Sequence, residues 1–366
     1  MKLATRPAQS EQRQNERRYH LSFPLVLLIL CALLLTVILL AVSFGSTPIP
    51  ISVIAQILLN GSGLFHFARA WDSTAELIVW QVRMPIVVAA ALVGAALAVA
   101  GALFQGMLRN PLADPFLVGT SSGAALGATI AFVLPFDTIY GTFFPLTSVL
   151  AFAGAMITVL LVYAIARTDG HTPVVTLLLA GAVINAVLIA FQTLILTLRS
   201  PAQFGGMQGI FNWLSGGIEV TGWLPVLIVG IIVLVGLVFS LSFSGTLDAF
   251  ALGEESAAHL GLQVERSKIL IVIVASLMTA AAVSISGLIG FIGLVIPHLM
   301  RLLLGPNHRS LLPATALAGA IFLTGTDLLA RVVVAPAVLP VGVFTALVGA
   351  PFFLFLLRSS KRDYRW

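Results

Sequence analysis

The chain has 366 residues, a mean hydropathy of +1.08 and a formal net charge of +5. Hydrophobic residues make up 59% of it and charged residues 9%, whereas soluble domains carry about 25% charged residues. This composition excludes a soluble globular domain and predicts an all-α, polytopic membrane protein. The basic residues stand at the ends of apolar runs, so membrane topology explains them and we expect no nucleic-acid partner.

Apolar runs of about 20 residues, long enough to cross a bilayer, follow one another along the chain. A polar, basic tail at 1–22 precedes the first run, which is too long for a signal-peptide core. We predict ten crossings, at 23–45, 84–107, 116–135, 145–166, 173–197, 222–243, 269–286, 291–304, 312–333 and 340–357. Together they form a transmembrane domain at 23–358, with a polar loop at 244–268 and a second tail at 359–366. The one cysteine, Cys31, lies in the first run and is expected to pack in the core.

The distribution of Lys and Arg indicates which side is cytoplasmic. With ten crossings, 15 of the 19 Lys and Arg residues fall on the side that holds both termini. The other side has only Arg69, Arg83, Arg199 and Arg331. Positive residues accumulate on the cytoplasmic side of membrane proteins, so we predict cytoplasmic termini.

Small residues recur every four positions in two of the runs. Gly94, Ala98 and Ala102 share one helix face, and the series at 182, 186 and 190 is all alanine. Such stripes allow close approach of helices in lipid, so both are expected to pack inside the bundle.

Catalytic motifs are weak. The six histidines are scattered, none lies in an HExxH pattern, and the chain has no GxxxxGK[ST] phosphate loop. We therefore predict no enzyme activity and no metal or cofactor bound by this chain. If the protein does energised work, the nucleotide is hydrolysed elsewhere.

Two cytoplasmic segments interrupt the apolar runs. Asn110-Pro111 predicts a turn after the second crossing, which on local features alone is either a mere turn or a functional loop. Glycines at 287, 290 and 293 break the chain before His298 and Arg301, which share a helix face. Broken helices at membrane depth face protein or a water-filled cavity. His298 and Arg301 are both expected to extend to the membrane interface.

Arg83 and Arg331 stand at the outer ends of two crossings. Arg331 follows Asp327 by four residues, a helix-surface pair worth about 0.2–0.5 kcal/mol. These arginines are either local anchors of this kind or a docking site for acidic side chains of another protein.

The segment FALGEESAAHLGL, at 250–262, is a compact polar helix between two apolar runs. Gly253 and Gly261 flank it, and Glu254 and Glu255 occupy its first turn, where the helix dipole favours acids. A short helix at the inner membrane face suits the groove of a partner protein. The alternative is a solvated connector.

Three stretches together resemble the iron-chelate uptake permease family, the membrane subunits of binding-protein-dependent, ATP-driven importers for ferric siderophores, haem and cobalamin. They are WQVRMPIVVAAALVGAALAVAGALFQGMLRNPLADPFLVGTSSGAALGA, ALGEESAAHLGL, and GLIGFIGLVIPHLMRLLLGPNHRSLLPATALAGAIFLTGTDLLAR followed by LPVGVFTALVGAPFFLFLL. The resemblance covers most of the chain from about residue 75.

The resemblance implies a type II ABC importer permease in the cytoplasmic membrane, with two permease copies (or a pair of similar permeases), a substrate-binding protein and two ATPase subunits that hold ATP and Mg. It assigns Arg83 and Arg331 to docking of the binding protein. Ile86 stands where a further basic residue is expected.

The resemblance also assigns two inner sites. An inner gate comprises Asn110, Leu112, Val174 and Val175, the last two replacing hydroxyl residues of the cobalamin permease. The helix that couples the permease to the ATPase comprises Gly253, Glu254, Glu255, Ser256, Ala257, His259, Leu260 and Gly261.

Other classes fit less well. A secondary transporter would carry buried acids for ions or protons, yet crossings two to five contain none. An intramembrane enzyme would need paired catalytic residues. For the cargo, a ferric siderophore is the first expectation because it is the family's commonest substrate, with cobalamin and haem as alternatives.

Overall fold

The computed structural model describes residues 22–45, 49–61, 71–133, 145–168, 171–198, 207–218, 220–335 and 337–360. Within these ranges the regular structure is helical, apart from an isolated bridge between Thr168 and His171. The two predicted tails lie almost wholly outside the described residues, as do Arg69 and Arg199.

The helices follow one another along the chain, and two short ones, the π-helix η1 and the 3₁₀-helix η2, adjoin longer α-helices. In chain order they are α2 (Phe23–Ser43), α3 (Ile51–Gly61), α4 (Ser73–Leu77), η1 (Ile78–Arg83), α5 (Met84–Leu108), η2 (Pro115–Val118), α6 (Thr120–Val133), α7 (Leu146–Ala166), α8 (Val174–Thr197), α9 (Met207–Leu214), α10 (Leu224–Ser242), α11 (Ser244–Phe250), α12 (Glu254–His259), α13 (Val264–Ser286), α14 (Ile292–Leu304), α15 (His308–Val332) and α16 (Val341–Ser360).

Each of the ten predicted crossings coincides with a helix, which confirms the polytopic α-helical class. Seven of these helices are long and apolar enough to cross a membrane. The remaining three, α6, α14 and the apolar part of α16, have 14, 13 and 14 residues. At 1.5 Å per residue such helices cover about 20 Å of a hydrocarbon core of about 30 Å. These three helices are the shorter members of the bundle, and each still lies at a predicted crossing.

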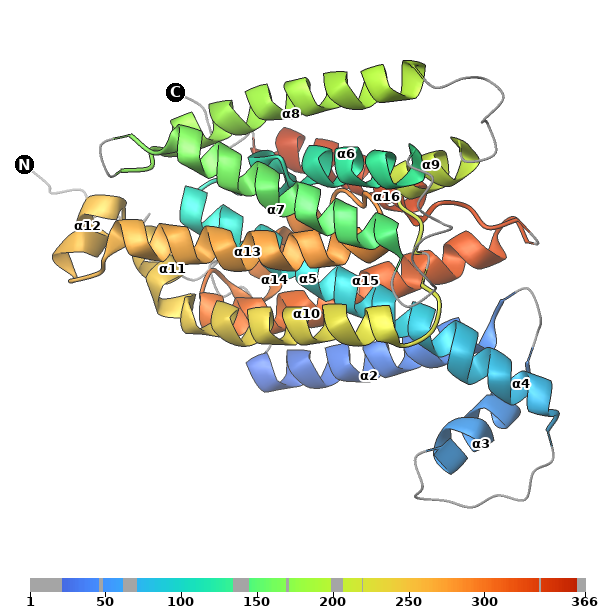
Figure 1. The fold of residues 1–366 in the computed structure, drawn as a ribbon. Helices are drawn as coiled ribbons and strands as arrows, with labels where there is room; N and C mark the ends of the chain where they lie inside the picture. Colours follow the sequence, from blue (N-terminus) through green and yellow to red (C-terminus); the bar gives the residue numbers. More distant parts are fainter. Residues whose placement is uncertain are drawn as a thin grey trace, which may run out of the picture.

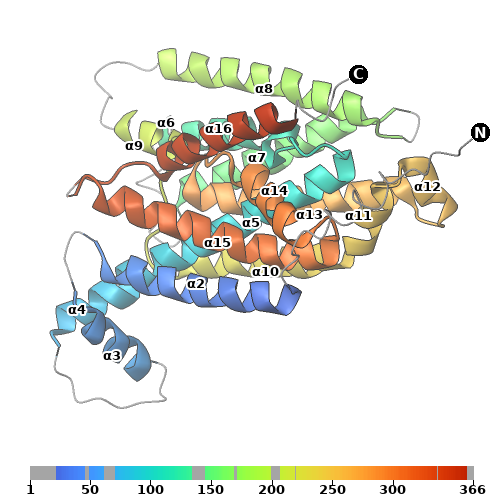
Figure 2. The ribbon, with the colours of Figure 1, turned by 180° about the vertical axis from the view of Figure 1, so that it is seen from behind.

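Helix α5 lies at the centre of the bundle, with α10, α13 and α15 around it (Figures 1 and 2). Its glycines permit this position. A Cβ at Gly94 would overlap the carbonyl of Gly319 in α15, and one at Gly101 would overlap the backbone of Gly293 in α14. Ala98 also packs against Gly319. The first small-residue stripe is therefore confirmed as a packing face.

Helix α8 lies at the edge of the bundle in both views (Figures 1 and 2). Its buried residues are Leu177, Ala180 and Gly181, whereas the alanines at 182, 186 and 190 are exposed. The prediction that these alanines pack inside the bundle of this chain is therefore wrong, because α8 contacts its neighbours through a different face. Cys31 is likewise exposed rather than packed in the core, since α2 buries few of its residues.

The two ends of the bundle carry different additions. Helices α11 and α12 project at one end, and α3 and α4 lie at the other (Figure 1). Helices α3 and α9 were not predicted, and α4 and η1 extend the second crossing into a helical run of 36 residues, Ser73–Leu108.

Candidate functional site

Helix α12 is bounded on both sides by glycines in backbone conformations that L-residues avoid. Gly253 has φ 106° and Gly261 has φ 84°. At the C-terminal end, the Leu262 N–H donates to the Ala257 carbonyl and the Gly261 N–H donates to the Ala258 carbonyl. This is the Schellman pattern. The predicted helix with its glycine boundaries is confirmed.

One face of α12 is turned outward. Ala257 is fully buried against the bundle, whereas Glu255 and His259 are exposed. Leu252 and Leu260, at either end of the helix, are 68% and 65% exposed. Two exposed leucines around a charged helix form a surface suited to a protein partner.

The turn after α5 is held by its own side chains. Arg109 ends α5 with φ 50°, and the Asn110 side-chain oxygen accepts a hydrogen bond from the Leu112 N–H at 2.9 Å. Asp114 caps η2 by accepting from the Phe116 N–H at 2.8 Å. Burial raises the pKa of the Asp114 carboxyl to about 6, and the Phe116 hydrogen bond opposes this shift.

Gln105 connects this turn to α14, although no sequence motif marked it as a functional residue. Its side-chain Nε2 donates to the carbonyl of Gly293 at 3.0 Å, and its Oε1 accepts from Arg301 Nη1 at 3.1 Å. Gln105 is 3% exposed. The prediction that Arg301 extends to the interface is wrong, because its guanidinium turns inward to satisfy a buried amide.

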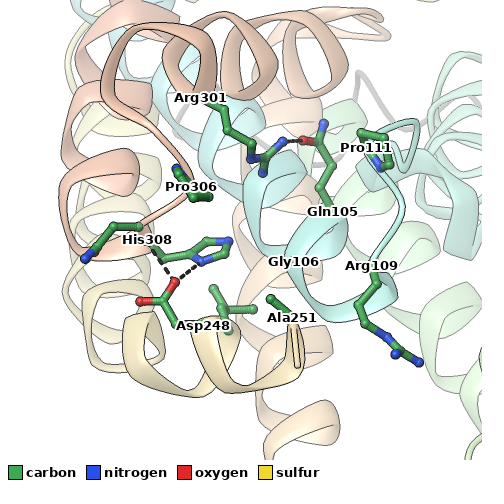
Figure 3. Close-up of a pocket in the computed structure, with 11 residues that line it drawn as sticks. Gln105, Gly106, Arg109, Pro111, Asp248, Ala251, Arg301, Pro306 and His308 are labelled. Carbon is green, nitrogen blue, oxygen red and sulfur yellow. Dashed lines mark hydrogen bonds and ion pairs between the residues drawn. The ribbon is translucent and has the colours of Figure 1, made fainter. Parts of the chain in front are cut away.

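A cavity of about 530 Å³ lies beside this contact (Figure 3). It lies between α5, α11 and the start of α15. On its far wall the Asp248 carboxylate accepts from the His308 N–H at 3.1 Å and lies 2.6 Å from His308 Nδ1. Arg301 and Gln105 face one another across the upper part of the view, while Arg109 points away. Asp248 and His308 were not singled out in the sequence, because 60 residues separate them.

The four predicted gate residues lie on two segments. Leu112 is 44% exposed, and Val175, at the start of α8, is 68% exposed. Val174 is half-buried beside the core. The segment after Asn110 reaches α8 through η2, where a Cβ at Gly181 would overlap the Leu117 carbonyl. The gate assignment stays a prediction.

Arg83 and Arg331 both contact the C-terminal end of α2. Arg83 Nη1 donates to the carbonyls of Val42 and Ser43 at 2.7 and 3.0 Å, and Arg331 Nη1 donates to the carbonyl of Ala41 at 3.3 Å. Arg83 is 5% exposed, so it is not a solvated anchor. The predicted Asp327–Arg331 pair is present at 2.6 Å, but Asp327 is 3% exposed. It is a buried pair, not a surface pair. Their docking role stays a prediction.

Comparison with known proteins identifies the kind of molecule to which these surfaces belong. The profile of the FecCD transport family matches residues 33–359. The chain belongs to this family.

Individual relatives agree with this assignment. A cobalamin import system permease protein of Halobacterium salinarum is 45% identical over 79% of this chain and 75% of its own length. A hemin transport system permease protein of Yersinia pestis is 36% identical over 83% of this chain and 91% of its own. A solved structure described as an inward-facing conformation of a metal-chelate type ABC transporter aligns with a TM-score of 0.78 at 29% identity, covering 92% of this chain and 99% of that one.

This FecCD chain is therefore a transport permease with the type II ABC importer fold, not an enzyme. ATP is hydrolysed by separate ATPase subunits. The family covers nearly all of the helical bundle, so the conclusion applies to the whole domain.

Proposed function

We propose that this chain is the membrane-crossing subunit of a binding-protein-dependent importer for a bulky metal chelate, and that ATP-driven movement enters it through α12. The observation that carries the proposal is the geometry of α12, a capped helix at one end of the bundle with Leu252 and Leu260 exposed. An ATPase surface that covered these two leucines would remove apolar area from water, which favours the contact.

The proposed assembly has two permease copies or a pair of similar permeases, two ATPase subunits that hold ATP and Mg, and an external binding protein. We place both termini and α12 on the cytoplasmic side, because that side then carries most of the Lys and Arg residues. Arg83 and Arg331 lie toward the opposite end. Both guanidiniums already donate hydrogen bonds to α2 carbonyls. We therefore propose that the two arginines attract an acidic binding protein through long-range electrostatics rather than through direct ion pairs.

The proposed inner gate comprises the Asn110–Leu112 turn and the start of α8 at Val174 and Val175. Leu112 and Val175 are exposed apolar residues, as expected where two copies close a path. Cargo would pass when these segments separate.

For the cargo, we propose a chelate of the ferric siderophore, haem or cobalamin class. A ferric siderophore is the first candidate from the sequence resemblance. Cobalamin is the second, favoured by the 45% identity to a cobalamin import permease. Measuring which chelate quenches the fluorescence of the cognate binding protein, and which labelled chelate enters proteoliposomes, decides between them. Entry of none of the three would reject the cargo class.

The coupling assignment is tested by Leu260→Ser in the reconstituted complex. It removes an exposed apolar contact without altering the buried face of α12, so we expect chelate uptake per ATP hydrolysed to fall while the chain remains folded. The exposed residue Arg358 at the end of α16 provides the control Arg358→Gln. If Leu260→Ser leaves the chelate uptake per ATP hydrolysed unchanged, the assignment of α12 as the coupling helix is rejected.

A further inference from the structure

Lys268 lies in the first turns of α13 and is 5% exposed. An ammonium group buried to this extent needs compensating charge. Two carboxylates provide it. Lys268 Nζ lies 2.6 Å from Glu254 Oε2 and 3.2 Å from Glu265 Oε1. Lys268 is thus the centre of an ion-pair network at the α12 end of the bundle, and His171 Nδ1 lies 3.9 Å from Glu265 Oε1 at its edge.

The two carboxylates join different elements. Glu254 is the first residue of α12, whereas Glu265 belongs to α13 and stands three residues before Lys268. Lys268 therefore ties the candidate coupling helix to the body of the permease. This contact is separate from the exposed face of α12 that the proposed function assigns to the ATPase.

Glu265 extends the network to a third segment. Its Oε2 accepts a hydrogen bond from the backbone N–H of Thr172 at 3.0 Å. Thr172 is 4% exposed, and its hydroxyl donates to the Tyr163 hydroxyl of α7 at 3.0 Å. Thr172 is thus fixed from both sides, by α13 and by α7.

The position of Thr172 determines where α8 begins. Pro173 follows it directly and is the N-cap of α8, so only one residue separates Thr172 from Val174. Proline fixes its own φ and restricts the residue before it. A displacement of Thr172 is therefore passed to the first turn of α8, where the predicted gate residues Val174 and Val175 lie.

We propose that Lys268 is a positioning residue that transmits displacement of α12 to the start of α8, through the chain Glu254–Lys268–Glu265–Thr172. Displacing α12 alone would break the 2.6 Å Glu254–Lys268 ion pair and leave the buried ammonium with Glu265 as its one remaining carboxylate in this network. This cost favours movement of α12, the start of α13 and the 171–173 segment together. The inference rests on the proposed function, which assigns α12 to coupling and Val175 to the gate.

The network could instead only stabilise the fold, so the test needs a readout that a structural role would not change. A reporter cysteine is placed at the gate with Val175→Cys in a Cys31→Ser background, which removes the natural thiol. The complex with its ATPase subunits is reconstituted in proteoliposomes. The measured quantity is the ratio of maleimide labelling rates at position 175 with vanadate-trapped nucleotide and without nucleotide.

Two variants interrupt the series of contacts Glu254–Lys268–Glu265–Thr172 at different points. Lys268→Met removes the residue at the centre of this series. Glu254→Ala removes only the link to α12 and leaves Lys268 paired with Glu265, so it is informative even if Lys268→Met fails to fold. The control Arg266→Gln removes an exposed positive charge from the same turn of α13. We expect the parent and the control to keep the nucleotide-dependent ratio of labelling rates. Lys268→Met and Glu254→Ala should each reduce this ratio by about fivefold or more, while ATP is still hydrolysed.

A parent-like ratio in folded Glu254→Ala or Lys268→Met would overturn the relay while leaving the proposed function standing. A parent that shows no nucleotide-dependent ratio would reject the gate assignment at Val175, and with it the end point of the relay. The two failures are therefore distinguished by whether the parent responds.

Discussion

At the scale of single residues, two arginines complete the end of the first membrane helix. The last carbonyls of a helix have no partners within it, and positive charge is favoured there by the helix dipole. Arg83 and Arg331 donate to three successive carbonyls at the end of α2. These arginines link α2 to η1 and α15.

Replacing Arg83 by Gln should lower the midpoint of thermal unfolding in detergent. A hydrogen bond from a charged donor contributes about 1.5–3 kcal/mol, and Gln is too short to reach both carbonyls. Arg358→Gln, at an exposed position, should leave the midpoint unchanged. Equal midpoints for the Arg83 and Arg358 variants would show that Arg83 does not hold α2.

Asp114 predicts a pH dependence of stability. Its pKa of about 6 lies above the ordinary value of 3.8, so the folded chain holds this proton more tightly than the unfolded chain. Its contribution to stability is fully present below pH 3.8 and is lost as the pH rises through about 6. Asp114→Asn keeps an oxygen that can accept from Phe116 and has no proton to lose.

We therefore expect Asp114→Asn to raise the unfolding midpoint relative to the parent at about pH 7.5 and to lose this advantage at about pH 4. The unfolding midpoints of parent and variant, measured at both pH values, test this expectation. A difference between variant and parent that does not change with pH would contradict the account of Asp114.

At the scale of elements, glycine contacts determine how closely α5 meets α14 and α15. Gly101→Ala should destabilise the chain, because its Cβ would overlap the backbone of Gly293. Overpacking of this kind costs about 1–3 kcal/mol. Gly245→Ala in α11 meets nothing within 4 Å and is the matched control. Thermal unfolding of the two variants should differ clearly, and equal midpoints would show that α5 and α14 separate without cost.

The helices at the ten predicted crossings were predictable because each lies in an apolar run that is bounded by charged residues, Pro or Gly. The short α12 was predictable from its two glycines. Helix α3 could have been found from its amphipathic pattern, but it is too short to stand out among longer runs.

The contacts between helices were much harder to predict from the sequence. Gln105 and Arg301 are 196 residues apart, and Asp248 and His308 are 60 apart. Neither pair has a local sequence signal. The burial of Arg83 was missed for the same reason, since its acceptors are backbone carbonyls, which any sequence provides.

At the scale of the whole molecule, the proposed sites occupy opposite ends of one bundle. Helix α12 projects from one end, and the helices that carry Arg83 and Arg331 reach the other (Figure 1). Helix α5 runs between the two ends as the most enclosed long helix. In this account the FecCD permease provides a path, and separate ATPase subunits provide the free energy.

The most direct test of this account measures accumulation of a labelled chelate against its gradient in proteoliposomes. Vesicles that hold the permease with its ATPase subunits, binding protein and ATP should accumulate the chelate. Vesicles that hold the permease alone should at most equilibrate it. Uphill accumulation by the purified chain, free of any ATPase subunit, would contradict the claim that its driving force comes from outside it.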